Sequence, residues 1–279
     1  AAVPPGADDG YVLALRWTAL EPGDTTLRGF RAMDRAADTV QRQHALRQVT
    51  LLVQNVVFAG DDGHIGLQVA GRVPVRRADN DLFGVAPAPG WDPRYDWQRW
   101  MSFEELPRSI DPRQGFALSA NQKITPPGYP GFVTMLWRAP FRARRIEELL
   151  QASSRHSVES FERIQADVTS LAAREMLRTL GSVEPATAPG RQALARLRAW
   201  DGAMRPEAPE PLLYHAWMQR LKQRIFEDDV GPLAPELVEP AALTGAMLGV
   251  LSGRARARDW CDDSRTAERH ETCAMLAAE

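Results

Sequence analysis

The sequence lacks the features of a membrane span and of a nucleic-acid-binding surface. No apolar run approaches the roughly 18 residues that a membrane-spanning helix needs. No five-residue window is dominated by Lys or Arg, and the formal net charge is -2, so no basic face is available for phosphate groups. We therefore expect neither a membrane nor a nucleic-acid partner.

A signal peptide is missing from the first residues, AAVPPGADDGYV, which have no positively charged start and no apolar stretch. The chain also opens without methionine, which favours a processed or excised piece of a longer polypeptide. The compartment must therefore be inferred from other features.

Cysteine is scarce, and the two that occur, Cys261 and Cys273, stand in the segment WCDDSRTAERHETCAM. A pair that encloses eleven residues can close a short disulfide loop, which would stabilise the fold by roughly 3 kcal/mol. Two buried thiols fit the sequence equally well. A zinc site is disfavoured, because His270 alone between the cysteines does not supply four ligands at the spacing of a zinc finger.

The common catalytic motifs are absent: the sequence has no G-x-S-x-G, no P-loop, no G-x-G-x-x-G and no H-E-x-x-H. Each histidine lies on an expected helix or helix edge, after a turn or in a polar tail, where a structural role is sufficient. These residues are His44, His64, His156, His215 and His270. We therefore assign a catalytic role to none of them.

Some acidic residues allow two interpretations. Asp61 and Asp62, or the Asp-Asn-Asp run at 79–81, present the hard oxygen ligands that calcium prefers. Turns use the same residues for backbone reasons, and we favour the turn interpretation. Glu104 and Glu105 are adjacent and point apart on any regular element, which weakens an acid and base pairing.

The composition that is present is that of a globular chain. With 279 residues, of which 44% are hydrophobic and 25% charged, it can bury the core of one large domain or two. The sequence pattern changes once along the chain, from strand-like to helix-like, and this change predicts an α+β fold. Residues 1–145 are expected to be strand-rich, and residues 146–279 to be helical.

Three patterns organise the first half. Residues 11–20, YVLALRWTAL, predict a mostly apolar strand, and PGDTT then starts an amphipathic helical stretch over 27–47. The clearest hairpin pairs VTLLVQNVVFAG with HIGLQVAGRVPV around an Asp-Asp-Gly turn at 61–63. Residues 76–95 are rich in Gly, Pro and Asp and are expected to form an ordered surface loop.

The second half contains the start and stop residues of a series of helices. A helix is expected at the end of YPGFVTMLWRAPFRARRIEELLQ, and the breaks GSVEPATAPG and DGAMRPEAPEP carry the residues at which helices stop and start. Further helices are expected over residues 157–180, 190–201, 208–228, 237–252 and 264–278.

Residues 115–121, GFALSAN, predict a strand that ends on an amide. With a period of two, Phe116, Leu118 and Ala120 share one face, and the other face carries only small residues before Asn121. A neutral carboxamide with two N–H donors suits the stabilisation of a developing oxyanion. Asparagine at a strand end also caps turns, and spacing alone favours the turn cap.

Six segments, taken in order over about residues 13–204, together form a specific pattern. They are LALRWTALEPGDTT, QNVVFAGDDGHIGLQVAGRVPVR, PAPGWDPRYDWQRWMSFEELPR, DPRQGFALSANQKI, YPGFVTMLWRAPFRARRIEELL and LRAWDGAM. These segments resemble the penicillin acylases (penicillin amidases), a family of N-terminal nucleophile hydrolases, and the tail WCDDSRTAERHETCA is also similar to that family. The resemblance places the chain inside the large (beta) chain of such an enzyme.

This resemblance implies the four-layer αββα core of the Ntn hydrolases, in part, followed by a largely helical section. It implies that Asn121 is the side-chain donor of the oxyanion hole. It also implies that Arg142, near the start of the helix in FRARRI, helps to organise the site, with Arg144 and Arg145 as close neighbours.

The same resemblance implies a nucleophile that this chain does not contain. Family members cut their own precursor and expose a serine whose α-amino group acts as the base, whereas this chain begins with Ala1. The nucleophile, the backbone part of the oxyanion hole and most of the acyl pocket are therefore expected upstream. The partners would be the small alpha chain and the N-terminal beta segment of the same precursor, which makes the precursor a zymogen.

No cofactor is expected. Calcium sites in the family use an aspartate shortly after the YP match, where this sequence has Gly131, Phe132 and Val133. The implied reaction is hydrolysis of a linear amide bond, that of the acyl side chain of a β-lactam antibiotic, of an acyl-homoserine lactone or of a related amide, in the periplasm or after secretion. The fragment alone would be inactive. The alternative is a non-catalytic binding or scaffold module that kept the fold without the nucleophile.

Overall fold

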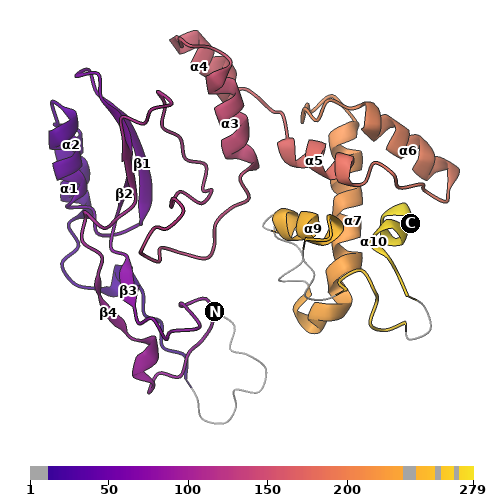
Figure 1. The fold of residues 1–279 in the computed structure, drawn as a ribbon, viewed down its shortest axis with the longest axis horizontal. Coiled ribbons are helices and arrows are strands. Elements are labelled where there is room, and N and C mark those ends of the chain that lie inside the picture. Colours follow the sequence, from indigo (N-terminus) through magenta and orange to yellow (C-terminus); the bar gives the residue numbers. More distant parts are fainter. Residues whose placement is uncertain (1–11, 235–242, 255–258, 267–269) are drawn as a thin grey trace. The chain divides into compact units, whose positions relative to one another are not determined.

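The computed structural model describes residues 12–234, 243–254, 259–266 and 270–279, and Figure 1 shows their helices and strands. The chain divides into two compact units, Ala1–Trp137 and Arg138–Glu279. Each unit has its own buried residues and is described by itself. Among the described residues, no helix is both long and apolar enough to cross a membrane.

The first unit is built on an antiparallel hairpin of β1 (Gln54–Ala59) and β2 (Ile65–Ala70). The predicted hairpin and its turn are confirmed: the Gly60 amide donates to the His64 carbonyl at 2.8 Å. A third strand, β5 (Arg108–Ile110), pairs with the other edge of β2, which gives the order β1-β2-β5.

β2 is the central strand of this sheet and is buried on both faces. Ala70 packs with Leu46 and Val49 on the face covered by helices, whereas Val69 belongs to a second cluster with Val73 and Leu106. The two clusters follow from strand geometry, because successive side chains point to opposite faces. Figure 1 shows the two helices of this unit side by side along one side of the hairpin.

These helices correct the expectation of one helical stretch over 27–47. The chain forms α1 (Thr26–Met33) and α2 (Thr39–Leu46) instead. Asp38 causes the break, because its side chain accepts a hydrogen bond from the Gln41 amide at 2.7 Å and caps a new helix rather than continuing the old one.

A second, two-stranded sheet pairs β3 (Pro74–Arg76) with β4 (Trp97–Trp100) and has an irregularity between Val75 and Arg76. The segment between the strands forms turns and one short 3-10 helix, η2 (Pro93–Tyr95). Asn80 fixes this loop: it is buried, and its side-chain oxygen accepts from the amides of Leu82 and Phe83 at 3.2 and 2.7 Å.

The strand expected over 11–20 is wrong within the described residues. Residues 12–17 have no regular structure, and Thr18–Leu20 form a 3-10 turn, η1. The apolar pattern predicted a buried strand, but the side chains of Val12 and Leu15 are 90% and 74% exposed. No sheet face buries them.

The strand expected over 115–121 is also wrong. Gly115 and Asn121, at its two ends, both have left-handed backbones, with φ of +79° and +66°, and no regular strand forms between them. An extended strand requires negative φ throughout. The Ala120 amide donates to the side-chain oxygen of Gln122 at 2.7 Å rather than to a neighbouring strand.

The second unit is helical. Figure 1 shows its longest helix, α7, with shorter helices around it. Side chains of α7 such as Leu221 and Ile225 lie at the centre of one cluster of buried residues that also draws on the helices on either side. The helices are α3 (Phe141–Gln151), α4 (Val158–Gln165), α5 (Leu171–Thr179), α6 (Ala188–Ala199), α7 (Glu210–Val230), η3 (Gly231–Leu233), α9 (Thr244–Leu251) and α10 (Cys273–Ala278).

The helix expected over 157–180 is in fact two helices, α4 and α5. Ser170 caps α5 by accepting from the Ala173 amide at 3.1 Å, and Thr169 forms an isolated bridge with Ala203. Among the described residues of the stretch predicted over 264–278, only Cys273–Ala278 are helical, because Thr272 caps α10. Part of each of the stretches predicted over 237–252 and 264–278 lies outside the described residues.

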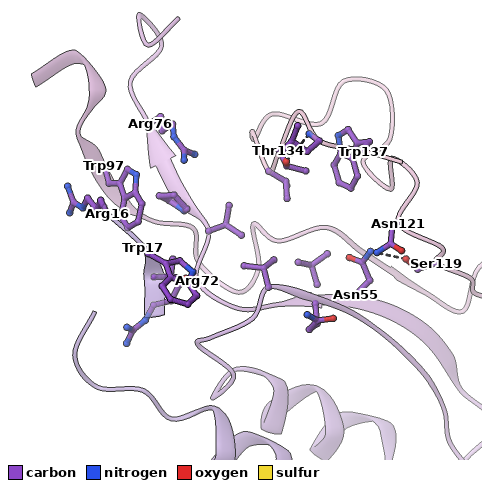
Figure 2. Close-up of a pocket in the computed structure, with 18 of the residues that line it drawn as sticks. Arg16, Trp17, Asn55, Arg72, Arg76, Trp97, Ser119, Asn121, Thr134 and Trp137 are labelled. Carbon is purple, nitrogen blue, oxygen red and sulfur yellow. Dashed lines mark hydrogen bonds between the residues drawn. The ribbon is translucent and has the colours of Figure 1, made fainter. Parts of the chain in front are cut away.

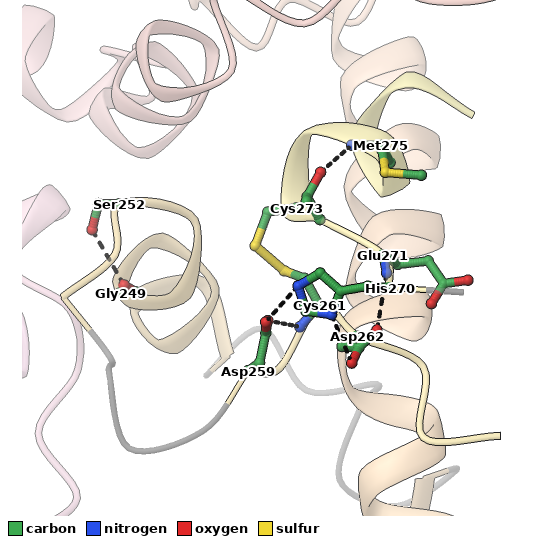
Figure 3. The surroundings of a disulfide bond; sticks show 10 residues. Gly249, Ser252, Asp259, Cys261, Asp262, His270, Glu271, Cys273 and Met275 are labelled. Atoms are coloured by element: carbon green, nitrogen blue, oxygen red, sulfur yellow. Dashed lines mark hydrogen bonds and ion pairs between the residues drawn. A yellow bond between two sulfur atoms is a disulfide. The ribbon is translucent and has the colours of Figure 1, made fainter. Parts of the chain in front are cut away.

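The alternative left open for the cysteines is decided in favour of a disulfide between Cys261 and Cys273, which Figure 3 shows beside α10. Asp262 lies next to it and accepts from the Glu271 amide at 2.9 Å. His270 contacts Asp262 at 3.0 Å, and the hydrogen bond to Asp262 raises the pKa of the imidazole. The bridge and these polar contacts hold the two ends of the segment together.

Candidate active site

A pocket of about 620 Å³ lies in the first unit, and Asn121 is in its wall. Figure 2 shows Asn121 beside Ser119 on one side of the pocket, with Arg16, Arg76 and Trp97 on the other. The lining residues are Arg16, Trp17, Thr18, Val53, Gln54, Asn55, Val57, Val69, Arg72, Val73, Pro74, Arg76, Trp97, Ser119, Asn121, Val133, Thr134, Leu136 and Trp137.

The loop that carries Asn121 is tied to β1. The Asn55 side-chain amide donates to the Ser119 hydroxyl at 2.8 Å, across 64 positions of sequence. Ala120 is buried next to it, while Asn121 itself is exposed at the pocket with its left-handed backbone. This arrangement presents a carboxamide at the end of a loop whose preceding residues are anchored. A neutral donor held in this way can stabilise negative charge on a carbonyl oxygen.

Apolar and aromatic side chains form much of the remaining wall. Trp17, Trp97 and Trp137 line it, together with valines from β1 and β2. Trp97 packs edge-on against Trp100 with ring centroids 5.2 Å apart, and the Arg16 guanidinium lies 4.5 Å from the Trp97 ring. A wall of this kind suits an organic ligand with an apolar part.

The charged residues that the described part of the chain contributes to the lining are arginines: Arg16, Arg72 and Arg76. Arg72 donates to the carbonyl oxygens of Pro22 and Gly23 at 3.2 and 3.1 Å. These arginines were not identified as site residues from the sequence. The only signal for two of them was their place at the end of the hairpin, in GRVPVRR, and this signal says nothing about a pocket.

Arg142 lies in the second unit, in the first turn of α3, and its side chain is exposed. Its neighbours have structural partners. Arg144 donates to Glu175 at 3.0 Å. Arg145 donates to both carboxylate oxygens of Asp167, at 2.9 and 2.7 Å, and these hydrogen bonds lower the pKa of Asp167 to about 2. Asn121 and Arg142 thus belong to different units.

No histidine lines this pocket. His64 contacts Asp111 at 2.8 Å, and this hydrogen bond raises the pKa of the imidazole. His156 bonds the carbonyl oxygen of Leu150 at 2.9 Å. These partners give the two histidines structural roles in the described part of the chain.

Two of the acidic residues that allowed a calcium interpretation, Asp62 and Asp79, have partners within the chain. Asp62 accepts hydrogen bonds from the amide and the hydroxyl of Thr39 at 2.9 and 3.0 Å. The hydrogen bond from the Thr39 amide is the main cause that lowers the pKa of Asp62. Asp79 is paired with Arg77 at 2.8 Å. Within the described ranges, no group of three or more His, Cys, Asp or Glu could hold a metal ion.

The adjacent glutamates have separate partners. Glu104 forms an ion pair with Arg47. Glu105 accepts from two nitrogens of Arg99, each at 2.7 Å, and these bonds together with the Ser102 amide lower its pKa to about 2. A carboxylate with so low a pKa is a poor general base at neutral pH.

The architecture and the sequence together identify a family. Residues 4–279 match the penicillin amidase family. The chain belongs to that family. The acyl-homoserine lactone acylase QuiP of Pseudomonas aeruginosa is 35% identical over 289 residues, which cover 96% of this chain and 33% of QuiP. The penicillin acylase 2 proenzyme of Pseudomonas sp. strain SE83 is 31% identical over 223 residues, or 78% of this chain and 28% of the proenzyme.

Among solved structures, a thermostable penicillin G acylase from Alcaligenes faecalis is similar with a TM-score of 0.59 and 22% identity, covering 79% of this chain and 39% of that chain. The penicillin amidase chain described here therefore has the α+β fold of the Ntn hydrolases, as its sequence segments implied. It spans about a third of the length of the curated relatives that it matches.

Proposed function

We propose that this chain is the part of a penicillin amidase-like hydrolase that supplies the side-chain donor of the oxyanion hole, Asn121. The enzyme cleaves a linear amide bond, such as that of a β-lactam acyl side chain or of an acyl-homoserine lactone. One observation carries the proposal: an exposed carboxamide, Asn121, stands in the wall of an aromatic-lined pocket. The names of the relatives, acylases in each case, support it.

The reaction proceeds through an acyl-enzyme. A serine hydroxyl attacks the amide carbon, and its proton passes to the serine's own α-amino group. The carbonyl oxygen becomes an oxyanion, to which the Asn121 N–H donates a hydrogen bond. The carbon–nitrogen bond then breaks as the amine takes up a proton. Water attacks the remaining ester, releases the carboxylic acid and regenerates the serine.

Other parts of the same precursor complete this site. The serine nucleophile, the backbone half of the oxyanion hole and the small alpha chain lie outside the residues printed here. The word proenzyme in the name of one relative supports a processed precursor. We place the enzyme in the periplasm or outside the cell, on the strength of the family and of the disulfide Cys261–Cys273, since disulfides persist in oxidising compartments.

The proposal includes no cofactor. Gly131, Phe132 and Val133 carry no oxygen-bearing side chain that could bind calcium, and the Phe132 ring packs against that of Phe83 with centroids 4.6 Å apart. This segment therefore does not fit a calcium site of the family type. Catalysis by serine, amine and carboxamide needs no metal.

Arg142 has a secondary place in the proposal, as a residue that organises the site. Its position in the first turn of α3 and its exposed side chain support this role. Because a lysine keeps the charge but loses the fork of donors, Arg142→Lys is expected to lower kcat. A variant with normal kcat would remove Arg142 from the site.

The decisive experiment separates catalysis by Asn121 from its backbone role. Asparagine is one of the few residues that tolerate positive φ, so the left-handed backbone alone would explain its presence. Asn121→Gly accepts the same backbone and removes the donor. In the complete protein, this variant is expected to keep its stability while kcat on a chromogenic acyl anilide falls roughly 10²- to 10³-fold.

Two further variants serve as controls. Asn121→Asp keeps the shape but replaces the N–H donors by a second acceptor, and is expected to be as inactive as the glycine variant. Gln54→Ala removes another exposed amide from the same pocket wall and is expected to leave kcat nearly unchanged. Near-normal turnover by Asn121→Gly would refute the oxyanion role.

A non-catalytic binding module is the second candidate. It is favoured by the pocket wall, whose hydroxyl groups, those of Thr18, Ser119 and Thr134, have no histidine beside them in the lining. A module of this kind would bind amides without cleaving them, even in the complete protein. Release of free amine from an acyl anilide by the complete protein, but not by the 279-residue chain, would decide for the hydrolase.

A further inference from the structure

Arg76 stands out among the residues that line the pocket. It ends β3 at the irregularity between Val75 and Arg76, and its side chain is half-buried rather than extended into solvent. Figure 2 shows it in the pocket wall on the side of Trp97, across the pocket from Asn121. The hydrolysis mechanism proposed above does not use it.

The guanidinium lies near an aromatic ring and a glycine. Its central carbon lies 5.8 Å from the centre of the Phe132 ring. A Cβ added to Gly84 would lie 2.9 Å from a terminal nitrogen of Arg76, so a side chain at position 84 would push the guanidinium aside. Gly84 also has a left-handed backbone, with φ of +78°. The side chain therefore has a defined place in the loop.

Arg76 has no counter-ion in the part of the chain that the structure describes: no hydrogen bond or ion pair joins it to a carboxylate. Burial lowers the pKa of its guanidinium, yet arginine remains charged at neutral pH. The other two pocket arginines differ: Arg72 donates to backbone carbonyls, and Arg16 lies 3.9 Å from both Glu21 and Asp96. A half-buried charge without a partner is unfavourable unless an anion pairs with it.

We infer that Arg76 binds a carboxylate of the substrate, so that the preferred amides are anionic. This inference rests on the proposed function. The planar fork of a guanidinium matches the two oxygens of a carboxylate, and such paired bonds are stronger than neutral ones. The neighbouring tryptophans accommodate the apolar part of the same molecule. An acyl-homoserine lactone has no carboxylate and would leave Arg76 unpaired, whereas a β-lactam nucleus or a dicarboxylic acyl group carries one.

A binding experiment tests the inference without turnover. Trp17, Trp97 and Trp137 line the pocket, so their fluorescence reports occupancy in the 279-residue chain. Phenylacetate and phenylacetamide differ in charge and hardly in shape. Phenylacetate is expected to bind roughly tenfold or more tightly than the amide, and Arg76→Gln is expected to abolish the difference. Equal binding of the two compounds by the unmodified chain would overturn the inference.

A kinetic experiment on the complete protein locates the carboxylate. Three anilides are compared: a neutral phenylacetyl anilide, the same anilide with a carboxylate on the aniline ring, and a glutaryl anilide with the carboxylate on the acyl group. Arg76→Gln is expected to raise KM roughly 10- to 100-fold for one of the two anionic substrates and to leave the neutral one unchanged. The substrate that responds identifies the side on which Arg76 acts.

Two variants sharpen this test. Arg76→Lys keeps the charge without the fork and is expected to restore part of the preference. Arg72→Gln is the matched control, because this arginine is already occupied by two carbonyl oxygens, and its effect should be the same for all three substrates.

If no anilide is cleaved, the proposed hydrolase function fails, while the fluorescence experiment still decides the role of Arg76. If the neutral anilide is cleaved as well as the anionic ones and Arg76→Gln has no selective effect, the inference is wrong although the hydrolase stands.

Discussion

In the second unit, one cluster of eighteen buried residues draws on α5, α6, α7, α9 and α10, whereas the described part of the first unit has two clusters of three buried residues each, on opposite faces of β2. The first unit compensates with polar contacts. The Thr26 hydroxyl, for example, accepts from the amides of Thr50 and Leu51 at 3.0 and 2.8 Å. The pocket with Asn121 lies in this unit, where hydrogen bonds rather than a large core hold the loops in place.

The largest expected effect compares one core residue from each unit. Ile225 and Leu46 are both fully buried. Ile225→Ala is expected to lower the free energy of unfolding by about 4 kcal/mol and Leu46→Ala by about 2, because a small cluster near the surface can collapse around the cavity more easily. Urea denaturation, combined with peptide-resolved hydrogen exchange in each unit, measures both. Equal losses would show that the two cores are equally rigid.

The disulfide gives the next largest effect, and it belongs to the second unit alone. Replacing Cys261 and Cys273 together by serine is expected to cost about 3 kcal/mol, because the open loop regains conformational freedom in the unfolded chain. Hydrogen exchange should accelerate first in α10 and in the part of α7 beside it. If reducing agent leaves the thermal unfolding of the unmodified chain unchanged, the bridge contributes nothing.

The Arg145–Asp167 pair gives a pH-dependent effect in the second unit. The pKa of Asp167 is about 2 in the folded chain and has its usual higher value in the unfolded chain, so the pair stabilises the fold above pH 4. This contribution is lost as the pH falls through 2. Asp167→Asn is expected to cost about 2 kcal/mol at pH 7 and nothing below pH 2. A cost that does not change between pH 7 and pH 2 would contradict the assignment.

The smallest effect tests the polar contacts of the first unit. Thr26→Val keeps the shape of the side chain but leaves the amides of Thr50 and Leu51 without their acceptor, which is expected to cost about 1 to 2 kcal/mol. Thr25→Val removes a single bond, to the Gln48 carbonyl, and is expected to cost less. If Thr26→Val is neutral while Leu46→Ala is severe, apolar burial and not hydrogen bonding holds the first unit together.

The elements that could be predicted are those that depend on local sequence patterns. The β1–β2 hairpin was predictable because its turn residues and its apolar pattern are local. The long α7 was predictable because proline and glycine mark its two ends. The strand expected over 115–121 was wrong because period-two patterning reports which side chains are buried, whereas a strand also needs a partner, and the left-handed Asn121 prevents extension.

The candidate site also contains features that the sequence indicated and features that depend on the folded chain. Asn121 was named from its segment and from the resemblance, but its position in a pocket wall depends on the Asn55–Ser119 contact between distant parts of the chain. No sequence pattern indicated a binding role for Arg76, because the lack of a counter-ion among the described residues is a property of the folded chain. Arg142 remains a prediction.

The family, the helical character of the second unit and the hairpin of the first could be recognised from the sequence alone. These features are local or repeat over many residues, so they survive without knowledge of the contacts. The folded structure was needed to show that Cys261 and Cys273 are bridged, that Asn121 faces a pocket and that Arg76 has no counter-ion among the described residues. Each of these depends on distances between residues that the chain brings together only when it folds.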